Sequence, residues 1–210
     1  EHFISGSRDP DAKPDAYFDP TSRNLISDLL LAAALGGRPI KEVYRWLTLN
    51  SFLEEAADIL TEGGYPMHAE RVRAIVEMSD KQRDGVLGTA MTNTAALLNT
   101  SIAPWVNPIL NEAGVDERPE FDPHSFVLGS GTLYSLSKEG EGSAGPLVLA
   151  LTAATIEAAE SLATTQKGGR LKTPLLGVLD EAANVCRWKN LPDLYSHFGS
   201  RGIVILSLFQ

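Results

Sequence analysis

The sequence predicts an α/β fold in which a half-sheet of parallel strands accompanies an all-α helical bundle. Two short aliphatic runs, at 174–179 and 203–210, are separated by a short helical segment that begins at Leu191. A strand, a helix and a strand in this order form a βαβ unit, whose strands are parallel. Between residues 20 and 102, apolar residues recur at helical spacing in segments with short connections, which is typical of an antiparallel bundle.

Five helices are predicted after residues 1–19, a connecting segment rich in proline and aspartate. Asp19 or Thr21 caps the first helix, Ser51 caps the third, and Pro104 ends the fifth. The predicted helices cover 20–35, 39–49, 51–62, 68–78 and 80–102. Their core is predicted to consist of apolar side chains at helical spacing: Leu25, Ile26, Leu29, Leu30, Ala33, Val43, Trp46, Leu47, Phe52, Ala56, Ile59, Leu60, Val86, Leu87, Met91, Leu97 and Leu98. We assign residues 20–120 to one all-α domain.

Residues 121–210 are predicted to form the α/β part. A strand region at Phe126–Leu128 and 132–136 follows an acidic linker that contains prolines. A helix rich in alanine and leucine covers 146–165 and is expected to be largely buried. The aliphatic run after Pro174 then predicts a strand that is buried on both faces, as in parallel sheets.

The composition of the 210 residues limits the possible classes of protein. A single cysteine, Cys186, excludes an internal disulfide, and no apolar run looks long enough to cross a bilayer. The net charge of −9 argues against a generally basic protein that coats nucleic acid. The charge is uneven, because residues 20–120 hold fourteen acids and nine bases, whereas residues 166–210 hold six bases and three acids.

Two adjacent carboxylates, Asp180 and Glu181, end the first aliphatic run, which is the layout of a Walker B element. In open α/β sheets, ligands bind beyond the carboxyl ends of the strands. Asp180 is therefore expected to hold Mg²⁺ through water, and Glu181 to orient or deprotonate the water that attacks the γ-phosphate. For so short a motif, two acids that merely end the strand and cap the following turn are an equal alternative.

A longer pattern surrounds these acids: Leu-Leu-Gly-Val-Leu-Asp-Glu-Ala-Ala-Asn at 175–184, Leu-Pro-Asp-Leu at 191–194, Gly-Ser-Arg-Gly-Ile-Val-Ile at 199–205, and the closing Gln210. This pattern resembles the coupling ATPases of type IV secretion, the TraG/TraD-like proteins of conjugative DNA transfer. Asp15–Thr21 and Val43–Leu47 resemble the opening of the all-α domain in actinobacterial members. The resemblance implies a RecA-like P-loop NTPase fold, with the all-α domain inserted ahead of the Walker B strand.

The resemblance also implies roles for residues in a parent protein that uses ATP and Mg²⁺. Arg201 is implied as an arginine finger that reaches the γ-phosphate of the adjacent subunit of a homo-hexamer, and Gln210 as a sensor of γ-phosphate. The cargo would be single-stranded DNA with a relaxase or another relaxosome protein, passed on to other type IV secretion subunits. The parent would lie on the cytoplasmic side of the membrane, anchored by N-terminal helices that this soluble fragment lacks.

The sequence departs from the family pattern in its phosphate-binding loop. No Gly-x-x-x-x-Gly-Lys-Ser/Thr motif occurs in the 210 residues, and the nearest imitation, at Gly140–Gly145, lacks the lysine. That segment is better explained as a loop in which Ser143 caps the next helix. We therefore expect this fragment alone to bind no nucleotide tightly and to hydrolyse no ATP.

Arg187, Trp188 and Lys189 follow the Walker B strand and are candidates for contact with DNA or a neighbouring subunit, although tryptophans are more often core or interface anchors. The acidic balance of the bundle favours a protein partner, and the histidines have no metal-ligand spacing. Two alternatives stay open: a cargo- or partner-binding helical module with a nucleotide-incompetent half-sheet, and another RecA-like DNA pump.

Overall fold

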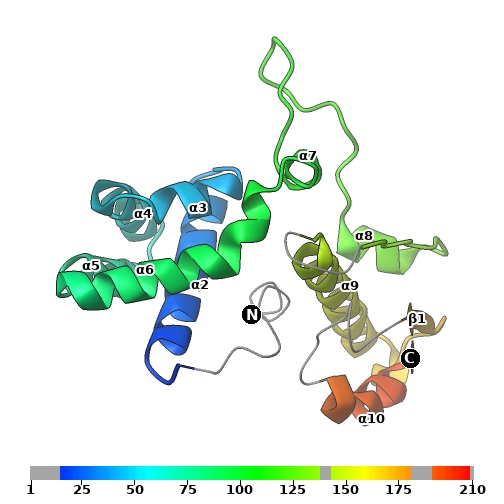
Figure 1. The fold of residues 1–210 in the computed structure, drawn as a ribbon. Helices are drawn as coiled ribbons and strands as arrows, with labels where there is room; N and C mark the ends of the chain where they lie inside the picture. The colour runs from blue at the N-terminus through cyan, green and yellow to red at the C-terminus, as the bar shows by residue number, and fades with distance from the viewer. Residues whose placement is uncertain (1–14, 138–142, 181–190, 209–210) are drawn as a thin grey trace. The chain divides into compact units, whose positions relative to one another are not determined.

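The computed structural model describes residues 15–137, 143–180 and 191–208, which form two compact units (Figure 1). The first unit ends at Glu117 and the second begins at Arg118. Within the described residues, the first unit contains only helices, whereas the second combines helices with a small parallel sheet.

The first unit is built around α2 (Phe18–Leu35), which contacts the four helices that follow it in the chain. Its other elements are α3 (Lys41–Trp46), α4 (Asn50–Glu62), α5 (Pro66–Val76), α6 (Asp80–Thr94), the 3₁₀ turn η1 (Ala95–Leu98) and α7 (Ala103–Val106). The five predicted helices correspond to α2 through α6. Short connections between amphipathic segments were therefore a sound basis for predicting helices that pack on one another.

The core of this unit contains most of the side chains predicted from helical spacing. Those that are buried are Leu25, Ile26, Leu29, Ala33, Val43, Trp46, Leu47, Ala56, Leu60, Val86 and Leu97. Leu98 was wrongly predicted to be in the core, because its side chain is 55% exposed. It lies in η1, where the tighter 3₁₀ winding changes which side chains share a face.

The helix ends differ from their predicted positions. Asp15, and neither Asp19 nor Thr21, caps α2: its Oδ1 accepts hydrogen bonds from the Tyr17 and Phe18 amides at 2.8 and 2.7 Å. Helix α4 begins after Leu49, and the Ser51 side chain does not cap it.

The predicted fifth helix, 80–102, ends early. Helix α6 stops at Thr94, whose hydroxyl donates to the carbonyls of Ala90 and Met91 at 2.8 and 3.3 Å. Such bonds from a threonine to the preceding turn weaken a helix, and the Thr-Asn-Thr run has low helix propensity. Pro104 consequently opens the short helix α7 and does not end the long one.

A buried carboxylate joins α2 to α5. The Asp28 side chain is 1% exposed, and it accepts hydrogen bonds from Arg71 Nε, at 2.6 Å, and from Arg71 Nη2. His68 Nδ1 lies 2.7 Å from Asp28 Oδ1. Because a buried charge is tolerated only with partners, this cluster fixes how the two helices pack.

The second unit confirms the predicted βαβ segment. Strand β1 (Leu175–Leu179), helix α10 (Leu191–Arg201) and strand β2 (Ile203–Ser207) follow one another, and the strands pair in parallel from Leu175↔Ile203 to Leu179↔Ser207. The other elements are α8 (Pro123–Leu128), α9 (Gly145–Thr165) and the 3₁₀ turn η2 (Lys167–Gly169).

The predicted strand region at Phe126–Leu128 and 132–136 is wrong. Residues 123–128 form α8, and residues 132–136 lie outside helices and strands. Asp122 decides the outcome, because its carboxylate accepts from the amides of His124 and Ser125 at 3.2 and 2.9 Å, while Pro123 occupies the first turn. Local capping therefore prevails over the β-propensity of the short apolar run.

Helix α9 packs against α8, α10 and β2 in the second unit. Its buried side chains Leu149, Ala153 and Ile156 share a core cluster with Phe198 and Ile203. Among the described residues, α9 is the one helix that is long and apolar enough to cross a membrane by length and composition, so the expectation of no such run needs this correction.

The β1–β2 sheet buries one face only. Leu175 and Ile203 pack on the core cluster, whereas Leu176 and Val178 point away and are 63% and 55% exposed. Val204 and Leu206 extend this exposed face on β2. The strand was predicted to be buried on both faces, which is wrong for the second unit, because the core cluster formed with α9 and α10 covers one face only.

Candidate functional site

The carboxyl edge of the sheet carries the predicted Walker B aspartate. Asp180 follows β1 directly and is exposed, and beside it the Leu208 amide donates to the Leu179 carbonyl at 2.9 Å. The Tyr195 hydroxyl forms a hydrogen bond with Ser207 Oγ on the neighbouring strand end. An exposed carboxylate at this edge fits the chemistry of a magnesium ion held through water.

Several predicted site residues lie outside the described residues: Glu181, Arg187, Trp188, Lys189 and Gln210. The base, the γ-phosphate sensor and the contact to DNA or a subunit therefore stay predictions. Within the part of the chain that the structure describes, no three His, Cys, Asp or Glu side chains gather into a metal-binding group. His68 instead pairs with Asp28, and His197 Nε2 lies 2.7 Å from Glu160 Oε1.

The amino edge of the sheet carries Arg201, the last residue of α10. Its Nη1 donates to the Gly169 carbonyl at 3.2 Å, and its own carbonyl accepts from the Leu171 amide at 2.9 Å. Gly202, with φ of +81°, makes the turn from α10 into β2. Any side chain there would be strained, and its Cβ would lie 3.3 Å from Leu171.

The structure therefore separates Asp180 from Arg201. Five residue pairs of β1 and β2 lie between the two edges, and a strand rises about 3.3 Å per residue, so the edges are on the order of 15 Å apart. An arginine at the amino edge does not reach a phosphate bound beside Asp180 of its own chain. A role in the site of an adjacent subunit is compatible with this separation.

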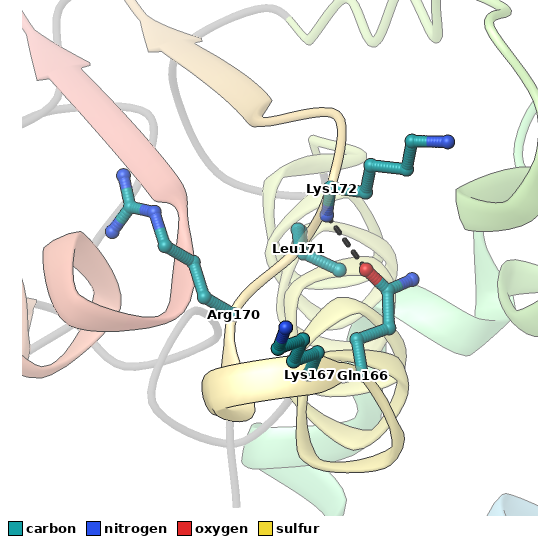
Figure 2. A pocket seen from close by; sticks show the side chains of 5 residues that line it. All are labelled: Gln166, Lys167, Arg170, Leu171 and Lys172. Carbon is teal, nitrogen blue, oxygen red and sulfur yellow. Dashed lines mark hydrogen bonds between the residues drawn. The ribbon is translucent and has the colours of Figure 1, made fainter.

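A basic loop, Gln166–Lys172, lies beside Arg201 and was not singled out from the sequence. It lines a shallow pocket of about 450 Å³ with Gln166, Lys167, Arg170, Leu171 and Lys172 (Figure 2). The Lys172 amide donates to Gln166 Oε1 at 2.6 Å. Arg170 Nη1 donates to the carbonyls of Gly199 and Ser200 at 2.5 and 3.1 Å, at the carboxyl end of α10.

Two consecutive glycines shape this loop, because Gly168 and Gly169 have φ of +76° and +66°. The sequence predicted only a helix over 146–165, which ends just before the Lys-Gly-Gly-Arg at 167–170. The signal that could have revealed more was the net positive charge of residues 166–210, since three of the six bases lie within six residues.

Comparison with known proteins bears on the same part of the chain. Residues 174–210 match the family model of the TraM recognition site of TraD and TraG. The match begins just before β1 and includes α10 and β2, so it coincides with the βαβ segment. No curated protein and no solved structure matches the chain.

Over residues 174–210, the chain is therefore similar to TraD/TraG-like conjugation coupling proteins, and the match supports a protein of that kind. It agrees with the resemblance drawn from residues 175–184, 191–194 and 199–205. The Walker B role of Asp180 and the actinobacterial type stay predictions.

Proposed function

We propose that this chain is part of a conjugative coupling protein and recognises a TraM-like relaxosome protein through residues 174–210. The observation that carries the proposal is the match to the TraM recognition site of TraD and TraG, whose bounds enclose a complete βαβ segment. A recognition segment that folds as one supersecondary unit presents its surface in a fixed geometry.

Helix α10 offers the most suitable surface in this segment. Leu191 and Phe198 are buried against the sheet, whereas Asp193, Tyr195 and Ser196 are exposed. The buried anchors restrict the motion of the helix, so little conformational entropy is lost when a partner binds its outer face.

In the parent protein, we further propose a RecA-like ATPase that moves single-stranded DNA. Asp180 would hold Mg²⁺ through water, Glu181 would activate the attacking water, and Gln210 would sense the γ-phosphate. Arg201 would act on the nucleotide of an adjacent subunit in a homo-hexamer, which the separation of the two sheet edges supports. Because these 210 residues contain no Walker A motif, the phosphate-binding loop would come from other residues of the parent.

The second candidate function is that of a partner-binding helical module with a nucleotide-incompetent half-sheet. The charge of the first unit favours a protein partner there, since residues 20–120 hold fourteen acids and nine bases. The family match supports recognition of a TraM-like protein through residues 174–210, whereas the charge pattern of the sequence favoured a protein partner for the bundle. Two surfaces therefore compete for the relaxosome protein.

A matched pair of substitutions tests the proposed recognition. Ser196 and Ser27 are both exposed serines in the middle of a helix, one in α10 and one in α2. Binding of the TraM-like protein from the same conjugation system is measured by calorimetry. We expect Ser196→Trp to weaken binding at least about tenfold, since a large side chain would prevent close packing, and Ser27→Trp to change it less than about twofold. Equal effects of the two substitutions, or no binding by the unchanged chain, would contradict the proposal.

The ATPase proposal is tested in the complete coupling protein. Glu181→Gln removes the base but retains the shape and the metal ligand Asp180. We expect ATP binding to persist while turnover falls at least about a hundredfold. Turnover within a few-fold of the unchanged enzyme would show that Glu181 is not the base.

A further inference from the structure

The basic loop Gln166–Lys172 concentrates positive charge without acidic neighbours in the sequence. Lys167, Arg170 and Lys172 are exposed, and no acidic residue occurs between positions 161 and 179. Among the described residues, none of these three cations forms an ion pair with a carboxylate.

In the first unit, most arginines show the opposite arrangement. Its arginines Arg38, Arg45, Arg71, Arg73 and Arg83 each lie within 3.8 Å of an aspartate or glutamate oxygen. Their charge is largely neutralised by neighbouring carboxylates. The basic loop is therefore a more favourable place for an external anion.

The geometry of the loop indicates an extended anion. Figure 2 shows that Arg170 and Lys172 leave the loop in different directions, so the cationic groups do not converge on one phosphate. Arg170 is held at the carboxyl end of α10, and the left-handed Gly168 and Gly169 keep the turn tight. A flexible chain of phosphates can follow such divergent cations, whereas a single small phosphate cannot contact them together.

We propose that the basic loop binds the phosphate backbone of single-stranded nucleic acid without reading its sequence. The loop contains no aromatic residue on which a base could stack, so its contacts are to phosphates. A lipid surface is a poorer match, because the loop's one apolar side chain, Leu171, is buried and cannot insert. Anion binding rests on the loop itself, and the choice of a single strand rests on the proposed function.

Salt-dependent binding of the chain to fluorescent oligothymidylate tests the proposal. The double substitution Lys167→Gln with Lys172→Gln is compared with Lys41→Gln with Lys81→Gln, which removes two exposed lysines of the first unit. Both variants change the net charge equally. We expect the loop variant to lose at least about tenfold in affinity at low salt, and its slope of log K against log salt to fall by about 1.4, since each single-strand phosphate contact contributes about 0.7. The control should bind within about twofold of the unchanged chain.

Several outcomes would overturn the inference: equal losses in the two variants, an unchanged slope in the loop variant, or loop-dependent binding of anionic vesicles without binding of oligothymidylate. Binding of the TraM-like protein is measured on the same variants. If the chain binds the TraM-like protein but its binding of oligothymidylate does not depend on the loop, the basic-loop inference is wrong and the proposed function stands. If the DNA result holds and the TraM-like protein does not bind, the recognition proposal is wrong and the loop remains a phosphate-backbone site.

Discussion

The ion cluster around Asp28 predicts an asymmetric response to substitution. The Asp28 side chain is 1% exposed, whereas that of Arg71 is 44% exposed. The hydrogen bonds that Arg71 donates to the Asp28 carboxylate raise the pKa of Arg71, so the guanidinium stays charged at any ordinary pH. Removing Arg71 leaves a buried carboxylate with His68 alone, whereas changing Asp28 leaves the half-exposed Arg71 and His68 side chains, which can turn to water.

These exposures set the expected magnitudes. Arg71→Met should lower the free energy of unfolding of the first unit by about 3 kcal/mol, the lower end for a broken buried pair, because His68 stays in contact. Asp28→Asn should cost about 1 kcal/mol, since asparagine keeps an oxygen acceptor and no charge is stranded. Arg73→Met is the control, because the side chains of its partners Glu54 and Asp58 are 45% and 68% exposed, and it should cost less than about 1 kcal/mol.

Hydrogen exchange of the whole chain, resolved by mass spectrometry to peptides of α2 and α5, measures these opening free energies. Arg71→Met should accelerate exchange in both helices far more than Asp28→Asn does. The reasoning is refuted if Asp28→Asn destabilises as much as Arg71→Met, or if Arg71→Met is no worse than Arg73→Met.

Three further predictions concern the second unit and the nucleotide. Hydrogen bonds from the Ser125 hydroxyl and amide lower the pKa of Asp122. The Asp122 cap therefore stabilises α8 at pH values above the ordinary aspartate pKa, and this stabilisation is lost as pH falls through the lowered value. Carboxyl NMR of Asp122 and amide exchange of α8 should show this loss, whereas fraying of α8 near neutral pH would contradict it. Gly169→Ala should lower the free energy of unfolding in urea by about 1 kcal/mol, because φ is +66° and the new Cβ would lie 2.9 Å from Arg201 Nη1. Gly199→Ala, inside helix α10, is the control and should be neutral or stabilising. Equal effects of the two substitutions would refute the strain argument. Calorimetry should detect no tight Mg-ATP binding by this chain, which lacks a Walker A loop, and a micromolar site would sink that prediction.

The βαβ segment could be predicted from the sequence because two aliphatic runs flank a helical pattern that begins at Leu191. Helix α8 could not, since Phe126–Leu128 fits a strand or a helix turn equally and the Asp122 cap decides between them. The exposed sheet face was missed because an aliphatic run has no alternation to show which side packs. The sequence correctly predicted that Asp180 lies at the carboxyl edge of the sheet. Its distance from Arg201 depends on the register of β1 against β2, which is seen only in the structure.

The basic loop shows a different limit of sequence analysis. The sequence predicted a helix over 146–165, and Lys167 and Arg170 were counted only in the net charge of residues 166–210. Only the structure shows that the Arg170 guanidinium binds α10, far along the chain, and that carboxylates pair with arginines of the first unit such as Arg45 and Arg73. The contrast between paired and unpaired cations depends on tertiary contacts.

The central claim is that residues 174–210 recognise a relaxosome protein. The most direct measurement is hydrogen exchange of the chain with and without the TraM-like protein from its conjugation system, compared peptide by peptide. The account predicts slower exchange in α10 and its flanking strands, and unchanged exchange in α2 through α6. Protection confined to α2 through α6 would place recognition on the helical bundle and contradict the account.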